Sequence, residues 1–395
     1  MPDTDAPAGP DVVAAAVGLA GAVRGARRET ERARRTPAWL AEEIAKAGLY
    51  QLYLPRAVGG PEAPPLVGFR AIEELSKADG SVGWCAMIAS IMASHLAKLP
   101  TEVGRELAGT PADYRASGSG RPGGPSAGRA WPVAGGWRIS GRWNFASGID
   151  NARWLYCTCL EMDGDAPRTT PAGRPALRML WVPREAATVL DTWSTMGMRG
   201  TGSQDFQVDG AFVPERRSAA ADAPPVQPGP LYHPRSLMAV QWTLTAANAL
   251  GIARGALDDL VAIAAEASTL DTRPLRDRPM VQARVGEAEA IVGAARAYVL
   301  EAVGRLWDEL RAGAAPSDHA VARARLAIVH GMRESARAVD IAFHAAGTNA
   351  IYTDLPLEAA FRDVHVAVQH GAALPGYYES AGKVLLGLRP TDPGW

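Results

Sequence analysis

The chain of 395 residues is 47% hydrophobic, which is enough for two or three packed units and typical of a globular enzyme. Its 41 Lys and Arg residues nearly balance its 42 Asp and Glu residues. This balance argues against nucleic acid or an anionic membrane as a partner, because both are bound through an excess of basic residues.

The first part of the chain has the pattern of packed helices. Residues 1–15 are predicted to be a disordered tail, because they begin with a Pro- and Asp-containing stretch that does not resemble a secretory signal. Residues 16–115 are predicted to form an N-terminal helical domain. Within it, Thr36 and Pro37 predict a helix start, since Thr caps helices and Pro is favoured at the first helical position.

Two uncharged runs, Gly80 to Ala97 and Ser236 to Ala253, reach the minimum length of a membrane span. Both contain polar side chains that hydrocarbon would penalise, among them Ser94 and His95 in the first run and Gln241 in the second. Buried core helices are therefore the better prediction, and no membrane partner is expected.

A central β region is predicted for residues 116–218, where glycine pairs and short alternating runs replace the long amphipathic ones. Gly135-Gly136 is predicted to be the turn of a hairpin, and the strand Phe206 to Val213 is expected to fold back at Asp209-Gly210. These strands predict a small antiparallel barrel or sandwich. The proline-rich residues 219–231 are predicted to be a linker.

Residues 232–395 return to helical spacing, in about four long segments. One apolar stripe there steps by three and four residues: Val281, Val285, Ala288, Val292, Ala295, Val299, Val303, Leu306 and Leu310. This pattern predicts an antiparallel four-helix bundle. The fold is thus predicted to be mainly α with a central β domain, unlike the alternating order of a nicotinamide-binding fold.

The motifs of several common enzyme classes are absent or misplaced. Gly118 to Gly123 has the letters of a dinucleotide fingerprint, but Pro122 and the lack of an acidic residue about 20 positions later favour a loop. The sequence contains no phosphate-binding loop, HExxH or GxSxG motif. The cysteines, Cys85, Cys157 and Cys159, predict neither a disulfide nor a metal site, and they favour a reducing cytoplasmic compartment.

Three segments carry candidate chemistry. Gly141 to Gly148 alternates aromatic residues and then presents Ser147, which would place a flat apolar wall and a hydroxyl beside a ring system. Asp191 to Ser203 contains Trp193, and Arg362 to His370 places a histidine eight residues after an arginine, on roughly one helix face. Taken singly, the first is consistent with a core strand and the last with a hydrogen-bonded helical histidine.

Together, and in this order from about Arg35 to Leu388, the three segments resemble the acyl-CoA dehydrogenase superfamily. They resemble more closely its oxygen-using branch, the two-component flavin-dependent monooxygenases that hydroxylate phenols, oxidise dibenzothiophene or oxidise amino sugars. The resemblance implies an N-terminal helical domain, a middle β domain and a C-terminal helical bundle around a flavin.

The catalytic base separates the two branches. A dehydrogenase needs a carboxylate to remove the proton α to a thioester carbonyl. The resemblance places that glutamate either nine residues after Arg362, which is Gly371, or near Gln241. Neither residue is a carboxylate, so an oxygenase is the favoured reading.

The resemblance also implies which residues contact the flavin. It places at the isoalloxazine ring Trp143, Phe145, Ser147 and Trp193, and near the cofactor Gly347 and Thr348. Arg278 is expected to reach the flavin phosphate of a neighbouring subunit. Arg276 and Arg284 remain alternatives, as does an ordinary solvated loop.

Three of these residues are expected to act in catalysis. His370 would deprotonate a phenol or hold the terminal oxygen of a flavin C4a-(hydro)peroxide, and Ser147 would form a hydrogen bond with the flavin N5. His95 matches a second histidine of the family, with a hydrogen-bonded core histidine as the alternative. No metal is expected.

The expected function is a flavin-dependent monooxygenase that receives FMNH2 or FADH2 from a separate flavin reductase and uses O2 to oxygenate a small aromatic substrate. A homo-oligomer, tetramer or dimer, is expected because the alanine-rich helix faces permit close packing. The alternatives are an acyl-CoA dehydrogenase-like or oxidase-like enzyme with a displaced base, an N-oxygenase of an amino sugar, and a non-catalytic relative.

Overall fold

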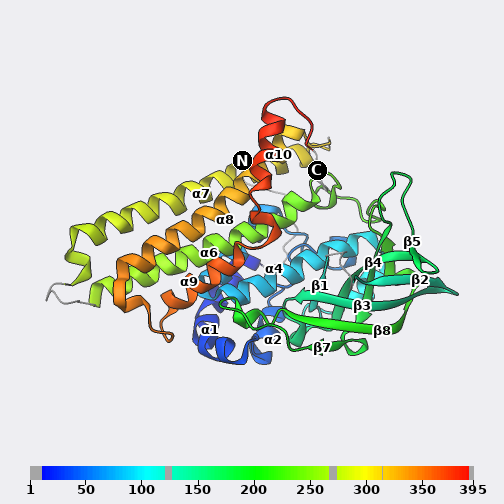
Figure 1. The fold of residues 1–395 in the computed structure, drawn as a ribbon, viewed down its shortest axis with the longest axis horizontal. Helices are drawn as coiled ribbons and strands as arrows, with labels where there is room; N and C mark the ends of the chain where they lie inside the picture. The colour runs from blue at the N-terminus through cyan, green and yellow to red at the C-terminus, as the bar shows by residue number, and fades with distance from the viewer. Residues whose placement is uncertain (1–10, 121–126, 267–273, 314, 391–395) are drawn as a thin grey trace.

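The computed structural model describes residues 11–120, 127–266, 274–313 and 315–390. Figure 1 shows the long C-terminal helices on one side, the sheet on the other, and the N-terminal helices between and beneath them. The first ten residues of the expected tail lie outside the described residues. Helix α1 already begins at Val12, because Asp11 caps it by accepting hydrogen bonds from the amides of Val13 and Ala14.

The N-terminal part is helical, as expected. Its elements are α1 (Val12–Ala33), α2 (Ala38–Lys46), η1 (Arg56–Val58), α3 (Pro65–Ala78), α4 (Gly80–Ser94), η2 (His95–Lys98) and α5 (Thr101–Ala108). Pro37, rather than Thr36, takes the N-cap position of α2, so this helix begins one residue later than expected. The stretch Gly80–Lys98 has the length and hydropathy of a membrane span, but 83% of its most apolar window is buried inside the fold. It is therefore a core helix.

The described strands form one sheet. They are β1 (Ala116–Ser119), β2 (Arg129–Val133), β3 (Gly136–Ala146), β4 (Trp154–Asp163), β5 (Ala166–Pro167), β6 (Leu177–Pro183), β7 (Thr188–Leu190), β8 (Gln204–Pro214) and β9 (Ser218–Ala220). The order is β7-β8-β3-β2-β4-β6-β9, with β1 and β5 also paired to β4. The expected hairpin joins β2 and β3.

Two features of the sheet differ from expectation. The sheet is mixed rather than antiparallel, because the β2–β3 hairpin places β2 next to β4, where it runs parallel, as does β1. Strand β8 does not fold back at Asp209-Gly210. It continues along β3, and the extra residue is absorbed by a bulge between Val208 and Ala211.

The C-terminal part is also helical. Its elements are α6 (Leu237–Glu266), α7 (Pro279–Arg311), α8 (Asp318–Ala346), α9 (Pro356–Ala367) and α10 (Gly376–Leu385). The expected stripe along α7 is buried or half-buried throughout. The run Ser236 to Ala253 lies mainly in α6 and is also a core helix, whose Asn248 donates to Ser76 Oγ and the Gly80 carbonyl.

Helix α6 packs closely on α3 and so joins the two helical regions. A Cβ atom on Gly251 would lie 2.5 Å from the Glu73 carbonyl oxygen, so only glycine permits this approach. The Glu73 carboxylate accepts two hydrogen bonds from Arg296 of α7, at 2.6 and 2.8 Å. The C-terminal helices α6 and α7 are thereby held against α3 of the N-terminal part.

Candidate active site

An aromatic corner, formed by Phe145 and Trp193, lies at the end of β3. The two rings meet edge to face, with centroids 6.2 Å apart. Phe145 has a φ of +61°, in the left-handed region, and its side chain is 49% exposed. About half of this aromatic residue is thus accessible at the strand end.

Trp143, which was expected on the same wall, lies instead in the core of the sheet. It is 2% exposed, stacks on Phe206 at 5.1 Å, and donates its indole N–H to the Thr158 carbonyl. An extra residue of β3 between Trp143 and Ala146 breaks the strand's alternation, so Phe145 points outward while Trp143 points inward.

Ser147 lies directly after the aromatic corner and is 4% exposed. Its Oγ accepts a hydrogen bond from Trp84 Nε1 at 3.1 Å and lies 2.6 Å from Ser203 Oγ. Ser203 Oγ in turn lies 2.7 Å from Thr201 Oγ1. The serine hydroxyl is therefore held by partners from α4 and from the segment before β8.

His370 follows α9, and its ring contacts Trp84, the residue that donates a hydrogen bond to Ser147. The imidazole and the indole of Trp84 meet edge to face with centroids 5.4 Å apart, and the indole of Trp242 in α6 meets the imidazole edge to face at 6.3 Å. The His370 Nδ1 accepts the Ala372 amide at 3.2 Å. In the neutral ring the proton is then on Nε2, so this nitrogen is a donor.

His95 belongs to a more distant part of the site. It lies eleven residues after Trp84, about 16 Å along a helix axis. Its ring stacks on Tyr156 at 4.8 Å, and burial, with Lys98 adding a smaller effect, lowers its pKa to about 4. The imidazole is therefore neutral at pH 7, and the structure does not bring it into contact with Ser147.

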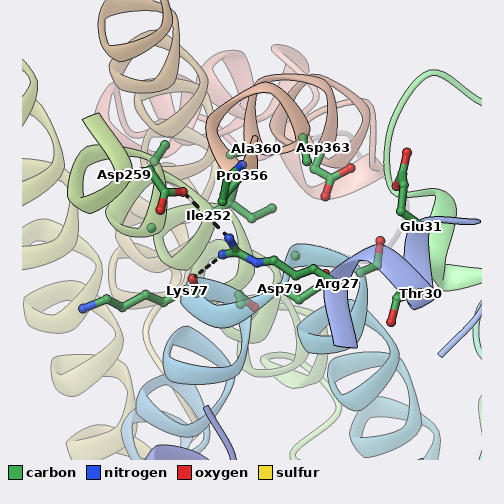
Figure 2. A pocket seen from close by; sticks show the side chains of 16 residues that line it. Arg27, Thr30, Glu31, Lys77, Asp79, Ile252, Asp259, Pro356, Ala360 and Asp363 are labelled. Carbon is green, nitrogen blue, oxygen red and sulfur yellow. Dashed lines mark hydrogen bonds and ion pairs between the residues drawn. The ribbon is translucent and has the colours of Figure 1, made fainter. Parts of the chain in front are cut away.

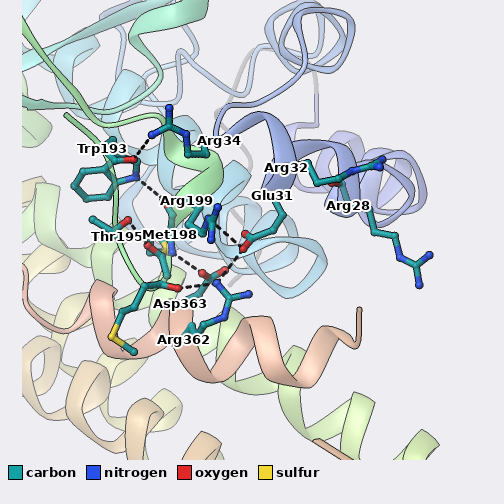
Figure 3. Close-up of polar contacts among 12 residues, drawn as sticks. Arg28, Glu31, Arg32, Arg34, Trp193, Thr195, Met198, Arg199, Arg362 and Asp363 are labelled. Atoms are coloured by element: carbon teal, nitrogen blue, oxygen red, sulfur yellow. Dashed lines mark hydrogen bonds and ion pairs between the residues drawn. The ribbon is translucent and has the colours of Figure 1, made fainter. Parts of the chain in front are cut away.

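The segment from Trp193 to Met198 is fixed by α9, as Figure 3 shows. Arg362 Nη1 donates to the Met196 carbonyl at 2.7 Å, and Asp363 Oδ1 accepts the Met198 amide at 2.5 Å. Trp193 Nε1 donates to the Met198 carbonyl at 2.9 Å. The aromatic corner is thus anchored to the helix that precedes His370.

A polar crevice lies behind this anchor, between α1, α3, α6 and α9 (Figure 2). It is small, with a volume of about 40 Å³, and Asp79, Asp259 and Asp363 are among its lining residues. Asp363 is 7% exposed. Burial, and then the charge of Asp79, raise the pKa of Asp363 to about 7.

The remaining expected residues lie elsewhere in the chain. Arg278 is the N-cap of α7, and Figure 1 places this end of the helix far from the sheet. Gly347 and Thr348 lie exposed in η9 (Gly347–Ala350), directly after α8. The structure of one chain does not gather these residues with Ser147 and His370.

Sequence reasoning missed four residues that the structure adds to the site: Trp84, Thr201, Ser203 and Asp363. Thr201, Ser203 and Asp363 lie inside the segments that were singled out, but nothing in the spacing shows their contacts. The signal for Trp84 is its place in the uncharged, mostly buried run Gly80 to Ala97, where an indole N–H needs a partner.

Two family models match the chain. The model described as acyl-CoA dehydrogenase, N-terminal domain, matches residues 19–106, and the model described as acyl-CoA dehydrogenase, C-terminal domain, matches residues 243–375. The matches cover both helical regions.

Relatives and solved structures cover nearly the whole chain. An indole-3-acetate monooxygenase from Pseudomonas putida is 33% identical over 349 residues, covering 88% of this chain and 86% of the relative. The oxygenase component of an FADH2-dependent resorcinol hydroxylase from Rhizobium sp. is 29% identical over 399 residues, covering 96% and 95%. The crystal structure of a 3-HSA hydroxylase from Rhodococcus sp. RHA1 superposes with a TM-score of 0.87 at 27% identity, covering 98% of this chain and 99% of that one.

Proposed function

The chain belongs to the acyl-CoA dehydrogenase family, and because its relatives there are flavin-dependent monooxygenases, we propose that the aromatic corner and Ser147 hold the ring of a reduced flavin. The chain is the oxygenase component of a flavin-dependent monooxygenase, with reduced flavin and O2 as its cofactors. The observation that carries the proposed site is the exposed Phe145 ring beside a buried, hydrogen-bonded hydroxyl.

The residues of this site fit a flavin. The ring system is flat and largely apolar on its faces, which suits the edge-to-face pair of Phe145 and Trp193. Its polar edge suits the Ser147 hydroxyl, which Trp84 and Ser203 hold in place. When bound, reduced flavin supplies the electrons by which one atom of O2 is transferred to the substrate and the other leaves as water.

His370 is placed to donate a hydrogen bond. Because its Nδ1 accepts the Ala372 amide, Nε2 carries the proton of the neutral ring and can hold an oxygen atom. A role as base would require the other tautomer and the loss of this contact. We therefore assign His370 the task of orienting the reacting oxygen, between the indoles of Trp84 and Trp242.

We propose that the substrate lies along the partly exposed face of α4. The residues of α4 and η2 that keep some exposure are Trp84, Ile88, His95 and Lys98, at the spacing of one helix face. Gln241 of α6, 8% exposed, donates from Nε2 to Ser94 Oγ at 2.9 Å. Its carbonyl oxygen is then available to accept the N–H or O–H of an aromatic substrate.

Thioester dehydrogenation gains no support from the structure. Its two expected base positions are Gly371, in a short turn after His370, and Gln241, whose amide is committed to Ser94. Neither provides the carboxylate that proton abstraction requires.

The partners follow from the two-component function. A separate flavin reductase supplies the reduced flavin, as the naming of the resorcinol hydroxylase relative as an oxygenase component supports.

Because Arg278, Gly347 and Thr348 lie away from the aromatic corner, we assign them to the flavin phosphate of a neighbouring subunit in a homo-oligomer, tetramer or dimer. The free cysteines Cys85, Cys157 and Cys159 support a cytoplasmic location.

The test combines flavin binding with turnover. Under anaerobic conditions, reduced FMN or FAD should quench the tryptophan fluorescence of the protein, and Phe145→Ala should weaken binding. Phe212→Ala is the matched control, because this ring is 56% exposed on β8 and lies outside the corner. With a generic flavin reductase and O2, a panel of phenols and indoles should then yield hydroxylated products.

Two results would contradict the proposal. Equal effects of the two Phe variants on flavin affinity would remove the aromatic corner as the ring site. Bleaching of bound oxidised flavin by an acyl-CoA without O2, together with no product from any aromatic compound, would favour the dehydrogenase.

A further inference from the structure

Three hydroxyl groups connect Ser147 to the backbone of Met198. We call Ser147, Ser203 and Thr201 the hydroxyl chain. The oxygens of Ser147 and Ser203 are 2.6 Å apart, those of Ser203 and Thr201 are 2.7 Å apart, and Thr201 Oγ1 lies 2.8 Å from the Met198 carbonyl oxygen. All three hydroxyl residues are buried.

The carbonyl end gives this chain a direction. A carbonyl oxygen only accepts, and each hydroxyl has one proton to donate. Thr201 therefore donates to Met198, so its contact with Ser203 must use the Ser203 proton. Ser203 has then no proton left, so Ser147 must donate to Ser203.

The indole of Trp84 completes the arrangement at Ser147. Its N–H donates to Ser147 Oγ at 3.1 Å and so takes one of the two lone pairs of the oxygen. The Ser147 proton points to Ser203. What Ser147 retains for any further partner is a single lone pair, so it can accept a hydrogen bond but not donate one.

The acceptor end is held in place by α9. Met198 has a φ of +51°, and its amide is bound by the buried Asp363 carboxylate at 2.5 Å. The carbonyl of the same residue accepts from Trp193 Nε1 as well as from Thr201. Figure 3 shows Trp193, Met198 and Asp363 together. These contacts prevent the Met198 carbonyl from turning away and releasing the chain.

We propose that this directed hydroxyl chain makes Ser147 an obligate acceptor and thereby selects reduced flavin over oxidised flavin. The N5 atom of reduced flavin carries a hydrogen, which Ser147 can accept. The N5 atom of oxidised flavin is itself an acceptor and would face the Ser147 lone pair. This inference rests on the proposed function, in which Ser147 lies at the flavin N5.

The preference is measured as a ratio of two dissociation constants on one protein, for oxidised and for anaerobically reduced FMN or FAD. The wild-type protein should bind the reduced form more tightly. Ser203→Ala removes the acceptor of the Ser147 proton, which is then free to turn to oxidised N5. The ratio should fall by roughly threefold to tenfold, the value of one neutral hydrogen bond.

Thr201→Val tests the same logic at another link. It preserves the shape of the side chain but removes the acceptor of the Ser203 proton, so Ser203 can donate to Ser147 and reverse the chain. The ratio should fall at least as far as in Ser203→Ala. Trp84→Phe is the matched control, because it removes a donor to Ser147 and leaves the Ser147 proton committed to Ser203. Its ratio should stay close to that of the wild type.

The outcomes separate this inference from the proposed function. If the wild-type protein bound neither form of flavin, the proposed function would fail. If it bound flavin but both Ser203→Ala and Thr201→Val kept the wild-type ratio, the directed chain would be wrong and the flavin site would stand. A general loss of affinity for both forms, with an unchanged ratio, would likewise overturn the directed chain.

Discussion

Asp363 makes the folding stability of this chain depend on pH, and Asp363→Asn should remove most of that dependence. Burial and the charge of Asp79 raise the pKa of Asp363 to about 7, Glu31 acts in the same direction, and the Met198 amide and Arg362 oppose it. A carboxyl whose folded-state pKa lies above its unfolded value favours folding fully at acidic pH. That contribution is lost progressively as the pH rises from about 4, the unfolded value, to about 7, the folded value.

The size of the effect between pH 5 and pH 9 follows from how far the pKa of Asp363 lies above pH 5. From about pH 5 to about pH 7 the unfolded carboxyl is ionised while the folded carboxyl is still protonated, so each pH unit lowers the free energy of unfolding by about 1.4 kcal/mol. Above about pH 7 the carboxyl is ionised in both states and the loss stops. The loss is therefore about 3 kcal/mol in free energy of unfolding. Asparagine keeps an oxygen for the Met198 amide and carries no charge at either pH. The variant should be about 1–2 kcal/mol more stable than the wild type near pH 5, where the unfolded carboxyl is already ionised, and this advantage should grow by about 3 kcal/mol by pH 9.

The assay is urea unfolding followed by tryptophan fluorescence at both pH values, in the absence of flavin. Groups that do not interact with Asp363, including His95, contribute equally to both proteins and cancel in the difference; the coupled carboxyl of Asp79 is part of the measured effect. Asp258→Asn is the control, because that side chain is 45% exposed and pairs with Lys77 at the surface. If Asp363→Asn lost stability with pH as steeply as the wild type, the buried charge would not be the cause.

Two further predictions test the site and the scaffold. His370→Ala should bind reduced flavin with near wild-type affinity but convert most of the consumed O2 to hydrogen peroxide, because Phe145 remains in place; an unchanged product-to-peroxide ratio would exclude the histidine from oxygen transfer. Glu73→Gln should lower the free energy of unfolding by roughly 1–2 kcal/mol in urea, because it breaks a charged pair with Arg296 whose exposure limits the loss. An equal loss in Glu289→Gln, which breaks a more exposed pair with Arg254, would show that burial of Glu73 is not the reason.

The helical regions were predictable because a helix face repeats along the chain. The stripe of α7 carries that information in its spacing, whereas α4 and α6 were recognised as core helices from long uncharged runs that contain polar side chains. The hairpin turn at Gly135-Gly136 was equally readable, since a glycine pair between alternating runs has few other uses. Parallel pairing with β4 was not, because strand order depends on contacts between segments that the sequence does not place.

The wall of the site shows where local reasoning fails. Strict alternation would put Trp143, Phe145 and Ser147 on one face of β3. The extra residue opposite β8 and the left-handed conformation of Phe145 change that parity, so one ring enters the core and the other leaves it. A bulge of this kind is decided by the partner strand, and the letters of β3 alone do not reveal it.

The segment from Asp363 to His370 reaches Ser147 from both of its ends, through contacts between residues that are far apart in the sequence. Asp363 fixes the Met198 amide across 165 residues, and the hydroxyl chain carries that constraint to Ser147. Trp84 then links Ser147 to His370, seven residues beyond Asp363. The hydroxyl proposed to face the flavin and the imidazole proposed to orient oxygen are therefore both positioned from the C-terminal end of α9, although one belongs to the β region and the other to the helical part of the chain.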